Sequence, residues 1–178
     1  MNRKYSVFIF NVASCADRYC SAYGRPYSMA EMFDRVRSIP QLSAVDLVMN
    51  AQFSADKDGI RANLARTGLN VASVAVDTFA NPIYQQGSLS SIDDAVRARA
   101  MADTRDAMDF AAELGCPIVT LWPGQDGYDY IFQADYLRER ARFQDALAEL
   151  CDYVLYDTKV MDPEKHKYYV GVLPDVIR

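Results

Sequence analysis

Aromatic and polar side chains that could bind a small polyol are concentrated in one segment near the C-terminal third of the sequence. The segment from Trp122 to Gln133 contains one Trp, two Tyr and one Phe among Asp and Gln residues. Aromatic rings stack on small ligands, while carboxylates and amides hydrogen-bond their hydroxyl groups. We therefore expect a substrate-binding site formed by residues of this segment: Trp122, Gln125, Asp126, Tyr128, Asp129 and Phe132.

The same segment has structural interpretations that the sequence leaves open. The aromatic side chains could close the end of a sheet without binding anything. Asp126 and Asp129 could act as general acid and base, but paired carboxylates in a Gly-rich loop also form turns. The pair Gly124 and Gly127 is too little to define a phosphate-binding loop.

Other chemistry has less support in the sequence. Catalytic metal sites need several converging ligands, and the one histidine is His166. Cys15, Cys20, Cys116 and Cys151 are too few and too unevenly spaced for a disulfide framework, so we expect reduced thiols. A net charge of −5 argues against binding to a nucleic-acid backbone.

The sequence shows neither a membrane span nor a secretion signal. It contains no apolar run of about 18 residues, the length that a spanning helix requires. The basic start at Met1–Lys4 is followed by an apolar stretch that Asn11 interrupts and that Asp17 and Arg18 follow. We expect a cytoplasmic protein.

The elements that must position the candidate site alternate between strand and helix patterns. This alternation is typical of a parallel α/β sheet. Ser28 and Glu31 form a capping box at the start of a helix that ends before Pro40, and Gly68 and Gly115 each follow a predicted helix end. We expect strands at 5–10, 45–49, 71–76, 117–122 and 153–156, and further helices at 56–66, 91–114 and 134–150. The inward side chains expected on the long third helix are Ala95, Met101, Met108 and Ala112.

These elements make about four and a half βα units of a (βα) barrel of the TIM type, with helices outside the sheet. The chain has 178 residues, and a complete eight-stranded barrel needs roughly 200 to 250. We therefore expect a single domain over residues 1–178 that forms a partial barrel. In such folds the loops after the carboxyl ends of the strands hold the site, and the long polar loops here are 11–27, 77–90 and 122–133.

Four segments carry a resemblance to a known family: Asn11–Arg18, Val45–Asn50, Val74–Phe79 and Thr120–Tyr130. In order, they resemble the N-terminal half of the xylose isomerase-like TIM barrels, over residues 4–150. The resemblance implies a sugar or sugar phosphate isomerase or epimerase that moves a proton or hydride between adjacent carbons. It also implies a small-molecule sugar substrate and a divalent metal, Mn, Mg or Co.

The family's metal ligands stand at the ends of strands five to eight. The nearest counterpart of its first ligand motif, Glu-Tyr-Lys, is Asp157-Thr158-Lys159, so the resemblance implies Asp157 as a metal ligand. Counterparts of strands six to eight are missing from the sequence. We therefore expect an incomplete protein that binds the metal weakly and is weakly active or inactive by itself.

Within the C-terminal segment, 151–178, residues 153–172 resemble a different family, the activating enzymes of glycyl-radical proteins. The shared features are Asp157-Thr158-Lys159 and Asp162-Pro163-Glu164-Lys165-His166. The Cys-x3-Cys-x2-Cys motif that holds the iron-sulfur cluster of those radical SAM enzymes is absent from the sequence. The change of resemblance suggests a chimera or a truncated reading frame with a join near 147–153.

A non-catalytic role is the alternative prediction. A partial barrel leaves two sheet edges with unpaired backbone groups, and such edges tend to recruit another strand or another copy. On this hypothesis the chain is a non-catalytic half-barrel that self-associates through its open sheet edges. A fragment of a radical SAM activating enzyme is a third hypothesis, and it would require iron and sulfide.

Overall fold

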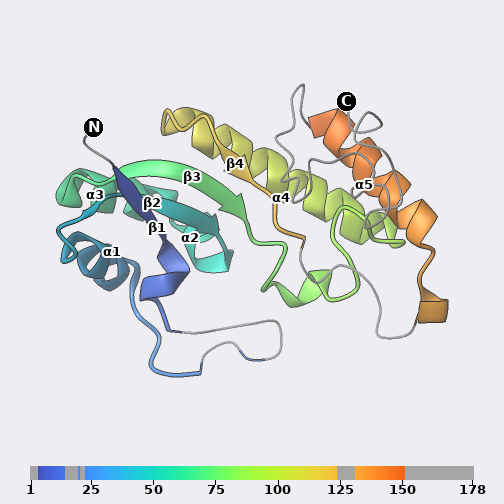
Figure 1. The fold of residues 1–178 in the computed structure, drawn as a ribbon, viewed down its shortest axis with the longest axis horizontal. Coiled ribbons are helices and arrows are strands. Elements are labelled where there is room, and N and C mark those ends of the chain that lie inside the picture. The colour runs from blue at the N-terminus through green and yellow to red at the C-terminus, as the bar shows by residue number, and fades with distance from the viewer. Residues whose placement is uncertain (1–3, 15–19, 21–22, 124–130, 151–178) are drawn as a thin grey trace, which may run out of the picture.

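A computed structural model describes residues 4–14, 20, 23–123 and 131–150 (Figure 1). Short strands alternate with helices along these residues. The elements in chain order are β1 (Tyr5–Phe8), the 3-10 helix η1 (Ile9–Val12), α1 (Met29–Arg37), β2 (Leu42–Met49), α2 (Ala51–Ala55), α3 (Lys57–Thr67), β3 (Asn70–Val76), η2 (Pro82–Tyr84), α4 (Asp94–Glu113), β4 (Val119–Thr120), η3 (Ile131–Gln133) and α5 (Tyr136–Leu150).

The strands form one parallel sheet in the order β1-β2-β3-β4. Each strand pairs with the one before it, and Ala75 of β3 lies opposite Thr120 of β4. Val45 pairs with Val71 and Asp46 with Ser73, so the register shifts by one residue at Ala72. A parallel sheet in consecutive strand order, with helices between the strands, confirms the predicted fold class.

Local signals in the sequence fix several helix ends. The backbone N–H of Glu31 donates to Ser28 Oγ at 3.3 Å, and the backbone N–H of Ser28 donates to Glu31 Oε2 at 2.8 Å. This reciprocal pair is the predicted capping box, and α1 ends at Arg37, before Pro40. Gly68 ends α3 with φ 68°, a left-handed conformation that side chains with a Cβ adopt at a cost.

The core lies between the sheet and its helices. Helix α1 packs on β2 and α3, and α4 packs on β3 and β4. The contacts bury large side chains of the helices, including Phe33, Ile60 and Phe110, in one cluster with Val45 and Val74. Figure 1 shows α5 beside α4, and a second cluster there contains Tyr84, Leu89, Ala100, Met101, Ala146 and Leu150.

Some predicted element bounds were wrong. The first strand ends at Phe8, because the chain turns into η1 over Ile9–Val12, and β4 covers only Val119–Thr120 of the predicted 117–122. The sequence reading missed α2, whose first turn is capped by Asn50. The predicted strand at 153–156 lies outside the described residues.

The predicted inward face of α4 was only partly right. Met101 is buried, but Ala95 and Ala112 are exposed. The helix begins at Asp94, after the cap Asp93, so Ala95 lies in an exposed first turn. The face toward the sheet runs through Ala107, Phe110 and Ala111. Ala112 follows Ala111 in the chain and therefore points about 100° away from it around the helix.

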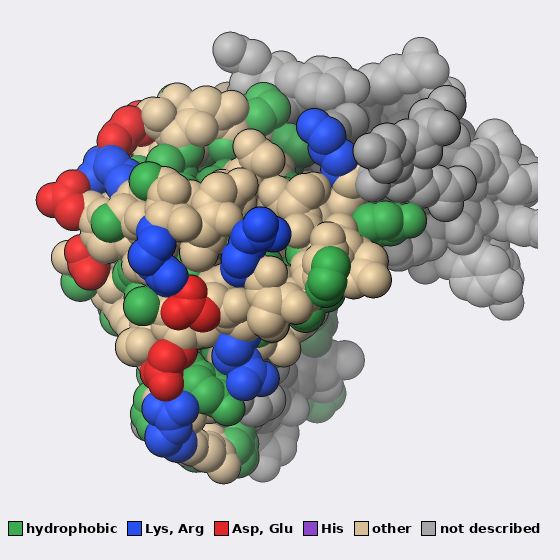
Figure 2. Space-filling model, turned by 90° about the vertical axis from the view of Figure 1, so that its left-hand side faces the viewer, with side chains coloured by type: hydrophobic (Ala, Val, Ile, Leu, Met, Phe, Trp, Pro, Cys, Tyr) green, Lys and Arg blue, Asp and Glu red, His purple; other side chains and the backbone are tan. Residues whose placement is uncertain are grey.

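Opposite charges are interspersed on the surface shown in Figure 2. Several of the ion pairs join neighbouring helices: Arg66 of α3 pairs with Asp34 of α1 at 2.5 Å, and Lys57 pairs with Asp106 of α4 at 2.6 Å. Exposed pairs of this kind each add little stability. In the described ranges, none of the helices combines the length and apolar character needed to cross a lipid bilayer.

Candidate functional site at the carboxyl ends of the strands

The parallel sheet brings the ends of its strands to one edge. After β3 the chain continues through Asp77, Thr78 and Phe79, and after β4 it continues through Leu121 and Trp122. Because β3 and β4 are paired neighbours, these two loop segments lie side by side. This is the edge at which parallel α/β folds bind their ligands.

Two aromatic rings meet at this edge. The rings of Phe79 and Trp122 are stacked, with centroids 4.6 Å apart and planes 4° from parallel. We call Phe79 and Trp122 the aromatic pair. Trp122 is 56% exposed, so the pair lies at the surface and is not simply part of the core.

Polar contacts hold the backbone under the aromatic pair. The hydroxyl of Thr78, 1% exposed, donates to the backbone oxygen of Trp122 at 3.2 Å. Asp77 Oδ1 accepts from the backbone N–H of Ala80 at 2.9 Å, which closes a turn around Phe79. Both loops are therefore fixed to each other at the point where the rings stack.

The loop after β3 is also attached to α4 through a buried tyrosine. Tyr84 is fully buried, and its hydroxyl donates to Asp103 Oδ2 at 2.6 Å. Burial of the phenol, together with this hydrogen bond, raises the pKa of Tyr84 above its ordinary value. Tyr84 therefore stays protonated and keeps its hydrogen bond at neutral pH.

The loop after β1 carries a charged group at its far end. Arg25 pairs with Glu31 at 2.9 Å, and the guanidinium groups of Arg25 and Arg35 both lie over the ring of Tyr27. The hydrogen bond from Arg25, followed by those from Ser28, lowers the pKa of Glu31 to about 2. These contacts belong to the N-terminus of α1 and order the loop as it enters that helix.

The structure places only two of the predicted substrate-binding residues. Trp122 lies in the aromatic pair, whereas Phe132 of η3 is 98% exposed. Gln125, Asp126, Tyr128 and Asp129 lie outside the described residues, as does Asp157. Sequence reasoning missed Phe79, and the available signal was an aromatic residue three positions after the end of a predicted strand.

The described residues do not form a metal centre. No group of three or more His, Cys, Asp or Glu side chains converges within the described ranges. Asp46 lies in the middle of the sheet, where Oδ1 accepts a hydrogen bond from Ser73 at 2.8 Å. The described residues therefore do not supply a complete set of metal ligands.

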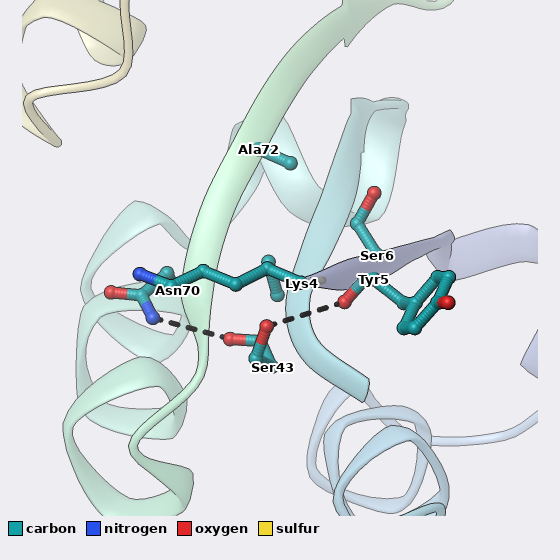
Figure 3. Close-up of a pocket in the computed structure, with 7 residues that line it drawn as sticks. Lys4, Tyr5, Ser6, Ser43, Asn70 and Ala72 are labelled. Carbon is teal, nitrogen blue, oxygen red and sulfur yellow. Dashed lines mark hydrogen bonds between the residues drawn. The ribbon is translucent and has the colours of Figure 1, made fainter. Parts of the chain in front are cut away.

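A cavity of about 230 Å³ lies at the opposite, amino-terminal end of the strands (Figure 3). Ser43 Oγ donates to the backbone oxygen of Tyr5 at 3.4 Å, and Asn70 Nδ2 donates to the backbone oxygen of Ser43 at 3.2 Å. These bonds connect the starts of β1, β2 and β3. The side chains of Ser43 and Asn70 at this cavity thus help to hold the sheet together.

Comparison with known proteins agrees with this architecture. The family model described as xylose isomerase-like TIM barrel matches residues 19–159. The matched range includes residues 147–153, and nothing in the match shows a join there or a radical SAM segment.

Curated relatives are xylose isomerases of greater length. The xylose isomerase of Thermus thermophilus is 36% identical over 92 residues, which are 48% of this chain and 24% of the relative. That of Actinobacillus succinogenes is 27% identical over 165 residues, which are 88% of this chain and 37% of the relative. The chain therefore spans about a quarter to just over a third of the length of these two relatives.

Solved structures share the fold at low sequence identity. The apo 3-keto-D-glucoside 4-epimerase YcjR of E. coli superposes with a TM-score of 0.55 at 13% identity, over 84% of this chain and 51% of that chain. A xylose isomerase-like TIM barrel protein of Mycobacterium smegmatis, in complex with magnesium, gives 0.54 at 15% identity, over 94% and 60%. Because the family model covers most of the sequence and the sheet has the matching strand order, this protein belongs to the xylose isomerase-like TIM barrel family.

Proposed function

We propose that this chain supplies the sugar-binding N-terminal half of a sugar isomerase or epimerase. The aromatic pair carries the proposal, because it presents stacked and partly exposed rings at the edge where this fold binds ligands. Membership of the family and the xylose isomerase relatives support the same substrate class. The C–H face of a sugar ring is a suitable partner for such a surface.

The residues that follow Trp122 complete the proposed site. Gln125, Asp126, Tyr128 and Asp129 offer hydrogen-bonding groups for sugar hydroxyls, and Phe132 offers a further ring. Asp126 and Asp129 are the candidates in this half for proton transfer between adjacent carbons. Their roles rest on sequence position and composition.

We include Asp157 in the proposal as a ligand of a divalent metal, Mn, Mg or Co. The xylose isomerase-like protein solved with magnesium supports a divalent metal in the family. The described residues offer no set of three converging ligands, so we assign no reaction step to the metal. We propose that the chain by itself is weakly active or inactive, because it lacks further metal-binding side chains.

Tryptophan fluorescence tests the sugar-binding proposal, because Trp122 is the one tryptophan of the sequence. We expect D-xylose or D-tagatose to change the emission of Trp122 in a saturable manner. Phe79→Leu removes one ring of the aromatic pair while keeping an apolar side chain. It should weaken sugar binding about three- to tenfold, the effect of one aromatic contact.

Phe33→Leu is the matched control, since Phe33 of α1 is also one ring of a stacked pair, with Phe53, but is buried in the other core cluster. It should leave sugar binding unchanged. Glycerol at equal osmolality controls for solvent effects on the indole. Equal sugar affinities in wild-type protein and Phe79→Leu would remove the aromatic pair from the proposed site.

Self-association is a second proposal, favoured by exposed apolar residues near the first and last strands of the described sheet. Tyr5 of the edge strand β1 is 50% exposed, and Ile118, just before β4, is 49% exposed. Light scattering coupled to size-exclusion chromatography should then give a dimer mass that Tyr5→Lys reduces to the monomer mass. A monomer in the wild-type protein at high concentration would argue against it.

A further inference from the structure

The longest connection among the described residues runs from the end of β3 at Val76 to the start of α4 at Asp94. It carries Phe79 near its beginning and Tyr84 near its middle. The part of this connection between Val76 and Tyr84 is fixed at its first end by β3. Where its other end is fixed determines how firmly the ring of Phe79 is held.

Tyr84 fixes that other end. Its ring lies in the second core cluster with Leu89, Ala100 and Met101, and it is fully buried. Its hydroxyl reaches Asp103 of α4 at 2.6 Å. Arg99, one turn earlier on α4, donates from Nε to Asp103 Oδ1 at 2.7 Å, so the two carboxylate oxygens have different donors. We call Tyr84, Asp103 and Arg99 the Tyr84 anchor.

The Tyr84 anchor is connected to the aromatic pair by a short, internally bonded segment. The backbone N–H of Tyr84 donates to the backbone oxygen of Asn81 at 3.0 Å, and Asn81 Oδ1 accepts from Ile83 at 3.1 Å. The turn closed by Asp77 and Ala80 then leads directly to Phe79. Successive hydrogen-bonded turns therefore join Tyr84 to Phe79, so we expect a displacement of Tyr84 to move Phe79.

We propose that Tyr84 and Asp103 are positioning residues that hold Phe79 in its stacked orientation against Trp122. The hydroxyl of Tyr84 donates to Asp103 of α4, on a different element from the two loops that carry the aromatic pair. On this proposal the orientation of the sugar-stacking surface depends on the hydrogen bond from Tyr84 in η2 to Asp103 on α4. The functional consequence rests on the proposed function, whereas the positioning itself does not.

Near-ultraviolet circular dichroism of the single tryptophan tests the positioning without any sugar, since a fixed, stacked indole gives a strong signal. Tyr84→Phe keeps the buried ring and removes the hydroxyl. Phe79→Leu defines the signal of an unstacked indole. We expect Tyr84→Phe to shift the tryptophan band toward that of Phe79→Leu, with the unstacked population raised about tenfold, as loss of a hydrogen bond to a charged acceptor allows.

Two controls separate positioning from general destabilisation. Tyr27→Phe removes a tyrosine hydroxyl in the loop after β1, and Asp106→Asn removes a carboxylate of α4 that pairs with Lys57. Both should leave the tryptophan band unchanged, even where they lower the melting temperature. If far-ultraviolet circular dichroism shows that Tyr84→Phe fails to fold, Asp103→Ala takes its place, because it removes the acceptor of the Tyr84 hydroxyl.

The outcomes distinguish the positioning from the sugar site. An altered tryptophan band in Tyr84→Phe, with an unchanged band in both controls, supports the positioning even if no sugar binds to the wild-type protein. Sugar binding with an unchanged band in a folded Tyr84→Phe or Asp103→Ala variant overturns the positioning and leaves the sugar site standing. A control variant that alters the band as strongly as Tyr84→Phe also overturns it.

Discussion

At the scale of single residues, Phe79 and Trp122 come from loops that are far apart in the sequence. Trp122 was predictable, because it begins a segment in which aromatic and polar residues are concentrated. Its partner was not, since the stacking depends on the pairing of Ala75 with Thr120 and on how each loop leaves its strand. Neither of these is encoded by residue type at one position.

Tyr84 predicts a specific loss of stability at high pH. Burial and the hydrogen bond to Asp103 raise the pKa of its phenol in the folded protein, whereas an unfolded tyrosine titrates near 10.0. The contribution of Tyr84 is therefore fully present below pH 10 and is lost as the pH rises toward the folded pKa, because only the unfolded state releases the proton. Denaturation in urea at pH 8 to 11 should show the decline.

Tyr84→Phe gives the comparison, because phenylalanine does not titrate. The free energy of unfolding of this variant should fall less steeply above pH 10 than that of the wild-type protein. The other tyrosines titrate equally in both proteins and cancel in the difference. Parallel curves for the two proteins would show that Tyr84 has no raised pKa.

At the scale of secondary structure elements, local signals predicted helix ends better than strand lengths. Ser28 and Glu31 specify a cap, and Gly68 a stop, through contacts within a few residues. The length of β4 depends instead on how far β3 continues beside it. For this reason the sequence located the fourth strand but overestimated its extent.

Gly68 provides a test of one such signal. Its φ of 68° lies in the left-handed region, and a Cβ there would meet no atom within 4 Å. Gly68→Ala should therefore lower the free energy of unfolding by about 1 kcal/mol through backbone strain alone. Urea denaturation measures the change.

Gly24→Ala is the matched control for this substitution. A Cβ at Gly24 also has open space around it, but the backbone φ there is not positive. The control should leave the stability unchanged or raise it slightly, by restricting the unfolded chain. Equal losses at both glycines would contradict a conformational cause at Gly68.

At the scale of the whole molecule, the sequence predicted the parallel α/β fold and the family, but the structure tests only part of the proposed site. Trp122 and Phe132 are placed, and they are not stacked on each other, because Trp122 stacks on Phe79. Asp126, Asp129 and Asp157 remain predictions, since they lie outside the described residues. Whether these three carboxylates come together depends on the tertiary structure, which a local sequence pattern does not predict.

The proposal that Asp157 is a metal ligand predicts how tightly this chain binds a divalent ion. Titration with Mn²⁺ in a calorimeter should show weak binding at most, because a single carboxylate ligand such as Asp157 does not hold a divalent ion tightly. Asp157→Asn should remove what binding there is, and Asp109→Asn on the exposed surface of α4 should not. Tight stoichiometric binding that survives Asp157→Asn would place the metal on other residues.

The consecutive pairing of β1, β2, β3 and β4 has a consequence for how the protein folds during synthesis. Each new strand finds its partner already made by the preceding unit, so the sheet can grow in the order in which the ribosome delivers it. The loop that must close at each step is one βα unit, which keeps the entropic barrier to each addition small. Pauses in translation after β2 or β3 should therefore leave a nascent chain with a protease-resistant N-terminal portion.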